Sequence, residues 1–319
     1  MKDVPEKVGI IGSGVVGSVL AAHLANAGKD VCVVDVFQPV IDAVREHGIR
    51  VDGILNVRAL PMAAVSTIRE MMDLGQDLVV ICVKSTALRR VADDMAACDD
   101  GEAAVMSFQN GLDTEEVLAE LFPRTRVFRG VVNYAGAVTG PGRVRTTFFH
   151  PPNHVGCLDQ ESSNWAINIA KLFTDAGLPT EYVADIRNKA WRKTILNACL
   201  MPVSVITRLP MNHIMETPET REIVVRLMKD FMEVAKAEGH VYEDGFVAHA
   251  LEYLDGSGGH KASMLMDFEA GNPLEMEFLN AKIQEYADRH HVPCETNRLL
   301  LALVRGLLLH RDLARKGEA

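Results

Sequence analysis

The chain has 319 residues, with 33 lysines and arginines against 43 aspartates and glutamates, so its formal net charge is −10. Nucleic acids and anionic membrane surfaces are bound by clusters of basic side chains, and the sequence has no such cluster, so we expect neither partner. The chain starts with charged residues where a signal peptide needs an apolar run, and no apolar stretch reaches membrane-spanning length. We therefore expect a cytoplasmic protein. The length favours two domains.

A glycine-rich turn follows the first apolar run. Residues 8–11 predict a buried strand, and residues 15–27 have helical periodicity. Between them, Gly12, Gly14 and Gly17 have the G-x-G-x-x-G spacing of a dinucleotide-binding turn, where glycine permits a tight turn and close approach of the pyrophosphate. The alternative is that the turn needs glycine for its geometry only. The predicted cofactor-binding residues of the turn are Gly12, Ser13, Gly14, Val15, Val16 and Gly17.

An acidic residue ends the second predicted strand. Residues 31–34 are apolar, and Asp35 follows them where a carboxylate can accept hydrogen bonds from an adenosine ribose. The same carboxylate repels the 2′-phosphate of NADP(H), and no arginine follows directly. We therefore expect NAD(H) rather than NADP(H). The alternative is that Asp35 only ends a strand in a loop.

Two further strands are predicted to end in polar residues at the same sheet edge. The apolar run 77–83 is typical of a parallel strand covered on both faces, and Lys84 follows it. The run 103–108 leads to Asn110. Ligands of open α/β sheets bind at this edge, so both residues are candidates for contact with cofactor or substrate. The alternatives are a solvated lysine and an ordinary Asn-Gly turn.

The rest of the first half continues the α/β pattern. Helices are predicted over 40–47, 87–97 and 114–121. The segment 136–158 predicts an antiparallel hairpin that extends the sheet. A helix and strand over 165–183 complete the first domain.

From Asp185 onward, long amphipathic patterns replace the β-branched runs, and they predict a helical domain. The first of these helices should stop near Met201, because Pro202 lacks an N–H group. The last should pack through Leu299, Leu300, Leu301 and Leu303. The predicted helices cover residues 186–201, 218–238, 246–254, 262–270, 274–291 and 298–310.

Lys193 and Asn197 are four residues apart in the first of these helices and so share one face. An enzyme that reduces a ketone needs a donor that delivers a proton to the carbonyl oxygen. A lysine in a partly desolvated cleft can do this, since burial lowers its pKa towards neutrality. The alternative is a surface lysine whose stem lies along apolar surface.

A second candidate acid lies further on. Asn272 and Pro273 predict the N-cap and first position of a helix, with Glu275 at its third position, as in a capping box. That pattern gives Glu275 a structural role. A carboxylate fixed at a helix N-terminus also stays ionised and can hold a lysine or a substrate group.

Together these features resemble the ketopantoate reductase (2-dehydropantoate 2-reductase) family. The resemblance rests on the glycine turn, Lys84, Asn110-Gly111, the helix with Lys193 and Asn197, and the stretch from Ser263 to Glu275. It implies an α/β fold in which a Rossmann-type doubly wound sheet, residues 1–184, binds the dinucleotide. A C-terminal all-helical domain, residues 185–319, serves substrate binding and dimerisation, with a small 2-keto acid bound between the domains and a homodimer as the assembly.

The resemblance also implies roles for individual residues. The general acid of the family falls on Lys193 and its essential glutamate on Glu275. The remaining roles are substrate binding by Asn110, Asn197 and Ser263, and cofactor contact by Lys84 and Asn110.

Two positions depart from the family pattern. Met201 stands where the family has an asparagine that binds the pantoyl hydroxyl, and Asp35 stands near the place where many members have an arginine for NADPH. We therefore expect an NADH-preferring reductase whose 2-keto acid substrate can be more apolar than ketopantoate. The alternatives are another two-domain NAD-dependent dehydrogenase, of hydroxyacid or opine type, and a non-catalytic NAD(P)-binding regulator. No metal site is expected, because the six cysteines are scattered without a C-x-x-C pair.

Overall fold

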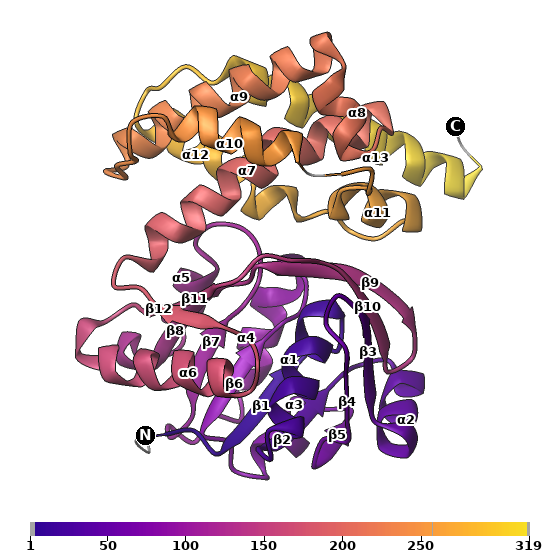
Figure 1. Cartoon of the computed structure of the whole chain (residues 1–319), viewed down its shortest axis with the longest axis vertical. Helices are drawn as coiled ribbons and strands as arrows, with labels where there is room; N and C mark the ends of the chain where they lie inside the picture. Colours follow the sequence, from indigo (N-terminus) through magenta and orange to yellow (C-terminus); the bar gives the residue numbers. More distant parts are fainter. Residues whose placement is uncertain (1–3, 257, 318–319) are drawn as a thin grey trace. The chain divides into compact units, whose positions relative to one another are not determined.

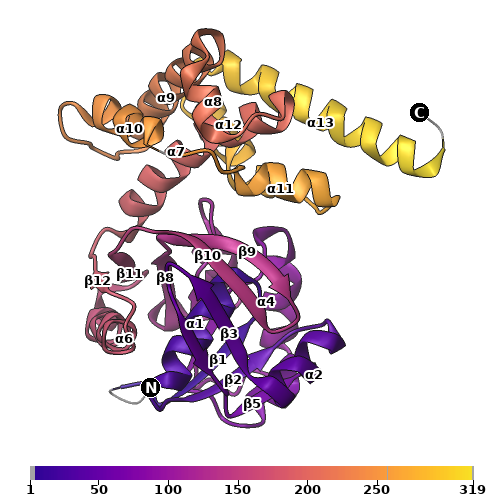
Figure 2. The same cartoon turned by 45° about the vertical axis from the view of Figure 1, so that its right-hand side comes forward.

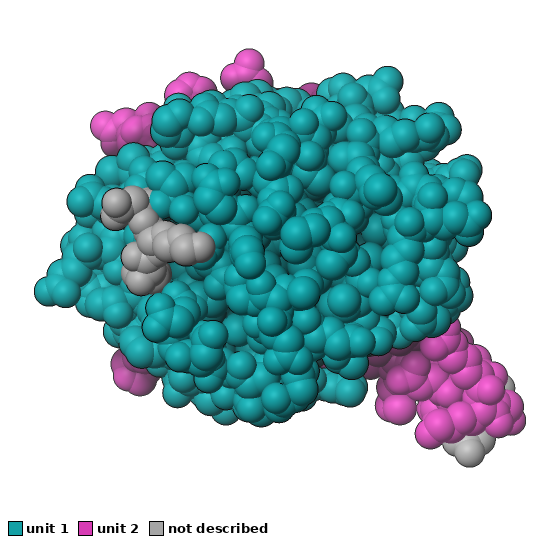
Figure 3. Space-filling model, turned by 90° about the horizontal axis from the view of Figure 1, so that it is seen from below, with its two compact units in different colours: residues 1–189 teal, residues 190–319 magenta. Residues whose placement is uncertain are grey.

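The structure is a computed structural model that describes residues 4–256 and 258–317 (Figure 1). It divides into two compact units, residues 1–189 and 190–319, which are coloured separately in Figure 3. The division falls inside helix α7 (Ile186–Thr207), which therefore contributes residues to both units.

Unit 1 is built on an eight-stranded sheet with the order β12-β11-β8-β7-β6-β1-β2-β5. The central strands pair in parallel, and β11 joins β8 in the antiparallel sense. Their near-continuous burial explains the apolar runs in the sequence. The strands are β1 (Lys7–Ile11), β2 (Asp30–Val34), β5 (Ala63–Val65), β6 (Leu78–Ile81), β7 (Ala104–Ser107), β8 (Val127–Val131), β11 (Asn153–Cys157) and β12 (Thr180–Tyr182).

Helices cover both faces of this sheet. Helix α1 (Val15–Asn26) contacts β1 and β2, and α6 (Ser163–Asp175) contacts β11 and β12. The other helices of the unit are α2 (Gln38–His47), α3 (Ile68–Met72), α4 (Leu88–Ala96) and α5 (Thr114–Ala119). This is the doubly wound, Rossmann-type arrangement that the sequence predicts.

The predicted segment 136–158 is divided between two sheets: its last strand, β11, extends the main sheet, but the hairpin itself does not. Strands β9 (Tyr134–Gly140) and β10 (Arg143–Phe149) belong to a separate four-stranded sheet with β3 (Ile49–Gly53) and β4 (Val57–Ala59), in the order β4-β3-β10-β9. The cause is a long-range parallel pairing of β10 with β3, in which buried Val144 lies opposite buried Val51. This second sheet contacts α1, and the Tyr134 hydroxyl donates to the Val16 carbonyl at 3.0 Å.

Unit 2 is helical, as expected, and its helices are best followed in Figure 2. Besides its part of α7, the unit contains α8 (Met211–Glu216), α9 (Pro218–Ala237), α10 (Phe246–Asp255), α11 (Ser263–Ala270), the 3₁₀ helix η4 (Glu275–Phe278), α12 (Asn280–Arg289) and α13 (Glu295–Lys316).

The prediction that Pro202 ends its helix is wrong, because α7 continues to Thr207. A proline inside a helix leaves the carbonyl four residues earlier without its N–H donor, here the carbonyl of Ala198. The Asn280 side-chain amide donates to that carbonyl at 2.9 Å and replaces the missing bond. Asn280 is fully buried and also donates to Asn297 at 2.9 Å.

The predicted capping box at Asn272 is also wrong. Helix α11 ends at Gly271, which has φ +77°, and the Asn272 backbone N–H then donates to the Asp267 carbonyl at 2.8 Å. Asn272 therefore completes the end of α11 instead of starting the next helix. Glu275 is the first residue of the 3₁₀ helix η4, and Leu274 precedes it as the N-cap.

The last helix is longer than expected and packs by fewer leucines. In α13, Leu300 and Leu301 are buried, whereas Leu299 and Leu303 are 62% and 47% exposed. The expectation that all four leucines pack is therefore wrong for these two. Among the described residues, no helix is both long and apolar enough to cross a membrane.

Candidate functional site

Four of the predicted site residues follow strands whose carboxyl ends are level. In the sheet register, Ile11 of β1 pairs with Val34 of β2 and with Ile81 of β6, and Ile81 pairs with Ser107 of β7. Gly12, Asp35, Lys84 and Asn110 follow these strand ends within one to three residues. Unit 1 thus brings all four to one sheet edge, where α/β proteins bind ligands.

The glycine turn has the geometry that a dinucleotide needs. Gly12 has φ +98°, and a Cβ at Gly17 would overlap the Gly12 carbonyl oxygen, so both positions require glycine. A Cβ at Gly14 would meet nothing within 4 Å, which leaves its backbone open to an approaching group. Gly14 is also the N-cap of α1, and no side chain caps this end of the helix. Its first-turn N–H groups can therefore receive a phosphate.

Asp35 is tied to the glycine turn. Its Oδ2 atom accepts from the Ser13 backbone N–H at 3.0 Å and from the Ser13 hydroxyl, and its Oδ1 atom accepts from the Phe37 N–H at 2.9 Å. Asp35 is half-buried, and each carboxylate oxygen offers two lone-pair sites, so it retains acceptor capacity for a ribose hydroxyl. Asp35 therefore does more than end a strand: it holds the turn in place.

Lys84 and Asn110 differ in their surroundings. Lys84 is exposed and precedes a short 3₁₀ helix, η1 (Ser85–Ala87). Asn110 is half-buried, and its Oδ1 atom is buried without a hydrogen-bond partner among the described residues. A buried acceptor of this kind costs free energy unless a ligand or water satisfies it. The free N–H groups of α1 and the acceptor oxygens of Asp35 and Asn110 therefore fit a polar organic cofactor at this sheet edge.

The loop that carries Asn110 rests on a buried ion pair that the sequence analysis missed. Arg129 and Glu115 have side chains only 2% exposed, and Arg129 Nε lies 3.6 Å from Glu115 Oε2. Arg129 also donates to the Ser107 hydroxyl at 2.9 Å and to the Gly111 carbonyl at 2.9 Å. Burial raises the pKa of Glu115 and lowers that of Arg129, and each charge opposes the shift of the other. The sequence gives one sign of this pair, which is the charged residue Arg129 inside the otherwise apolar strand β8.

In unit 2, α7 presents Lys193, Asn197 and Met201 at intervals of four residues, so they lie on one face of the helix. All three are half-buried. The neighbouring Arg192 is held by Glu243 through two contacts of 2.7 Å, and its guanidinium lies 4.7 Å from the Phe246 ring centroid. This stretch of α7 is therefore anchored directly beside Lys193.

Two other predicted residues lie close to this face. Ser263, the first residue of α11, has its hydroxyl 3.9 Å from the Met201 sulfur. Glu275 is 7% exposed, and its neighbours Leu274 and Met276 belong to a core cluster that also packs Met201. Ser263 and Met201 are therefore in contact, and Glu275 lies beside the core cluster against which Met201 packs.

The described residues contain no group of three or more histidines, cysteines, aspartates or glutamates that could hold a metal ion. All six cysteines are free.

The fold and the sheet edge define a class, that of two-unit α/β proteins with a dinucleotide-binding turn and a helical second unit. The ketopantoate reductase PanE/ApbA family model matches residues 8–160, and the model for the C-terminal part of that family matches residues 185–308. The chain belongs to the ketopantoate reductase family.

Two relatives match most of the length of the chain. The 2-dehydropantoate 2-reductase of Archaeoglobus fulgidus is 30% identical over 302 residues, which are 95% of this chain and 98% of the relative. The enzyme of the same name from Pyrococcus horikoshii is 27% identical over 301 residues, which are 94% of this chain and 96% of the relative.

Solved structures agree with the fold. A PanE/ApbA family ketopantoate reductase from Ralstonia eutropha superposes with a TM-score of 0.87 at 28% identity, over 96% of this chain and 99% of that chain. A D-mandelate dehydrogenase solved with NADH and anilino(oxo)acetate has a TM-score of 0.85 at 20% identity, over 94% and 97% of the two chains. At that identity the second likeness concerns the fold alone.

Proposed function

We propose that this chain is a pyridine-nucleotide-dependent reductase that converts a 2-keto acid into a 2-hydroxy acid, as 2-dehydropantoate 2-reductases do. The observation that carries the proposal is the family match over both halves of the chain, with relatives of that name covered almost end to end. The glycine turn and the open N-terminus of α1 support a dinucleotide cofactor.

A reduced nicotinamide cofactor held by the glycine turn would supply the hydride for the carbonyl carbon. Lys193 donates a proton to the carbonyl oxygen as negative charge develops there, which is general acid catalysis. Glu275 orients the lysine or a substrate group, and the Ser263 hydroxyl binds the substrate carboxylate. Asn197 lies one turn from Lys193 and binds the substrate, while Asn110 and Lys84 serve the cofactor side. The half-burial of Lys193 and the burial of Glu275 support these roles.

The preferred cofactor is NADH. The support is Asp35, a carboxylate at the end of β2 that keeps acceptor capacity for a ribose hydroxyl and repels a phosphate in its place. The substrate carries an apolar group where ketopantoate carries its hydroxyl. The support is Met201, whose thioether is a weak acceptor and cannot donate a hydrogen bond.

The protein assembles as a homodimer and works in the cytoplasm. The support is that Leu299 and Leu303 are exposed four residues apart on α13, so they share one helix face that a partner subunit can cover. Six free cysteines are usual in a reducing compartment. Light scattering coupled to size-exclusion chromatography tests the dimer, and a monomer at micromolar concentration would refute it.

The function is tested by following the oxidation of NADH and of NADPH with a panel of 2-keto acids that includes ketopantoate and branched-chain and aromatic 2-keto acids. We expect turnover with at least one member and the formation of the 2-hydroxy acid. Binding of NADH without turnover of any 2-keto acid would instead indicate a nucleotide-binding regulator.

A further inference from the structure

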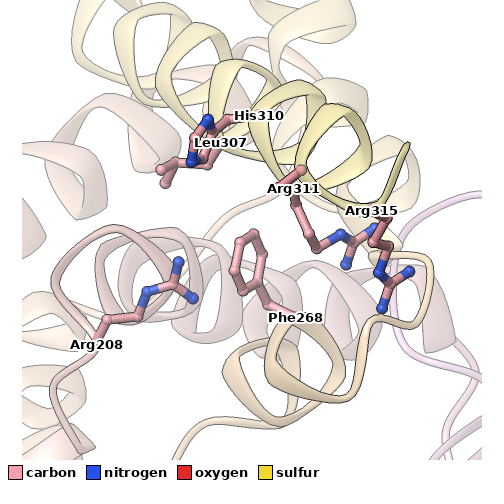
Figure 4. A pocket seen from close by; sticks show the side chains of 7 residues that line it. Arg208, Phe268, Leu307, His310, Arg311 and Arg315 are labelled. Carbon is pink, nitrogen blue, oxygen red and sulfur yellow. The ribbon is translucent and has the colours of Figure 1, made fainter. Parts of the chain in front are cut away.

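A cavity of about 420 Å³ lies in unit 2, and none of the residues that line it has a role in the proposed reaction. It is bounded by α11, by the last turns of α13 and by the residue that follows α7 (Figure 4). Its volume is within the range of small-molecule binding sites. The residues that line it are Arg208, Phe268, Leu307, His310, Arg311, Ala314 and Arg315.

Two of its arginines are held against one aromatic ring. The Arg208 guanidinium carbon lies 3.9 Å from the Phe268 ring centroid, and that of Arg311 lies 5.3 Å from it. Phe268 is only 8% exposed, so the packing around its ring holds the ring in one position. Figure 4 shows Phe268 between the two guanidinium groups, with Leu307 and His310 on α13 above them. Contact with an aromatic face orients a guanidinium without using its N–H donors.

The positive charge of this cavity is poorly compensated. Arg311 donates to the Asn272 carbonyl at 3.2 Å and Arg315 to the Gly271 carbonyl at 3.3 Å, which are neutral acceptors. The one carboxylate that pairs with a lining arginine is Asp312, at 3.4 Å from Arg311, and no ion pair among the described residues involves Arg208 or Arg315. A guanidinium has five N–H donors, so most of them remain for a ligand.

Arg305, on the same helix, provides the contrast. It does not line the cavity, and it pairs with Glu277 at 3.2 Å, as is usual for a surface arginine in an acidic chain.

Two positions at the rim of the cavity have a left-handed backbone. Arg208 has φ +63°, a left-handed conformation that costs free energy for a residue with a side chain. At Gly271, with φ +77°, an added Cβ would overlap the Arg315 guanidinium, so the absence of a side chain there gives the guanidinium its place. Arg208 and Gly271 thus give the rim of the cavity two left-handed backbone positions.

We propose that this cavity binds a small organic oxyanion, a phosphate monoester or a carboxylate attached to an apolar group. The oxyanion accepts hydrogen bonds from Arg311 and Arg315, which lie on the same side of the Phe268 ring, because guanidinium groups match the geometry of phosphate and carboxylate oxygens. The apolar group packs on Leu307 and Ala314, which supply the apolar part of the lining. The lining includes no residue of the proposed reaction, and Phe268 and Leu307 pack in the same core cluster as Met201.

The test is calorimetric titration of the full chain with phenyl phosphate and, in a second arm, with phenylacetate. We expect saturable 1:1 binding of at least one probe with a dissociation constant below about 1 mM. Arg311→Gln and Arg315→Gln should each weaken it by about tenfold or more, as expected for loss of a charge-assisted hydrogen bond. Arg305→Gln, the matched control on α13, should leave the affinity unchanged. If phenyl phosphate binds and phenylacetate does not, the ligand is a phosphate ester.

Equal affinity in wild type, Arg311→Gln and Arg315→Gln would overturn the proposal, because the probe would then bind elsewhere, for example at the glycine turn. Absence of saturable binding of both probes up to about 10 mM would overturn it as well. Arg315 is exposed, so its substitution should leave the fold intact, which thermal unfolding of the same samples checks.

Discussion

The hydroxyl of Ser263 lies 3.9 Å from the sulfur of Met201, which is a weak acceptor. In the proposed function, Ser263 meets the substrate carboxylate and Met201 faces the substrate side chain. The pair therefore joins a polar contact to an apolar one, and this combination should decide which 2-keto acids are reduced.

Replacing Met201 by asparagine tests that role. We expect kcat/KM for ketopantoate to rise by about tenfold, since a hydrogen bond to a substrate hydroxyl contributes about 1–2 kcal/mol. Trimethylpyruvate, which has the same branched carbon but no hydroxyl, is the control and should gain nothing. An equal change in kcat/KM for both substrates would show that the residue at position 201 does not contact the substrate hydroxyl.

Replacing Asp35 by alanine tests the cofactor preference. The wild type should have the higher kcat/KM with NADH, and Asp35→Ala should reduce the ratio of NADH to NADPH by about tenfold, since a ribose hydrogen bond is lost and the repulsion of the phosphate is relieved. Asp42→Ala, at an exposed position on α2, is the control. A wild type that prefers NADPH would contradict this interpretation of Asp35.

Arg129 should matter more for stability than any surface arginine. Arg129→Met leaves the Glu115 carboxylate buried without its partner and should lower the free energy of unfolding of unit 1 by about 3–5 kcal/mol. Arg124→Met removes an arginine from a more exposed pair with Glu116 and should cost under about 1 kcal/mol. Denaturant unfolding compares the two, and similar losses would show that the buried pair has no special weight.

The pair between Arg192 and Glu243 should give a pH-dependent contribution. Hydrogen bonds from Arg192 lower the pKa of Glu243 from 4.5 to about 2. A lowered carboxyl pKa stabilises the fold above the unfolded value of 4.5, and this contribution disappears as the pH falls towards 2. Because both side chains are partly exposed, Glu243→Gln should cost under about 1 kcal/mol at pH 7. The difference in unfolding free energy between wild type and Glu243→Gln should vanish as the pH falls to about 2. A difference that stays constant with pH would contradict the lowered pKa of Glu243.

Local patterns predicted most of the fold correctly. The glycine turn, α1 and the parallel strands follow from residues within one short stretch, so the sequence was sufficient for them. The errors came from distant partners. Pro202 is tolerated in α7 because Asn280 donates to the orphaned Ala198 carbonyl across 82 positions of sequence. The hairpin left the main sheet because β10 pairs with β3.

The candidate site shows the same limit. Positions such as Lys193 and Glu275 could be assigned through resemblance, but the capping box predicted for Glu275 failed because Asn272 is used to end α11. The Arg129–Glu115 pair and the cavity arginines lay outside the prediction, since their partners come from separate segments and no spacing rule connects them.

The most direct test of the account is the turnover of Lys193→Ala with the best 2-keto acid found in the panel. We expect kcat to fall by about 10²–10⁴-fold, the usual contribution of a general acid, with an unchanged thermal unfolding temperature. Lys229→Ala, an exposed lysine on α9, should retain wild-type turnover. A Lys193→Ala variant with near-normal kcat would contradict the central claim that this lysine protonates the carbonyl oxygen.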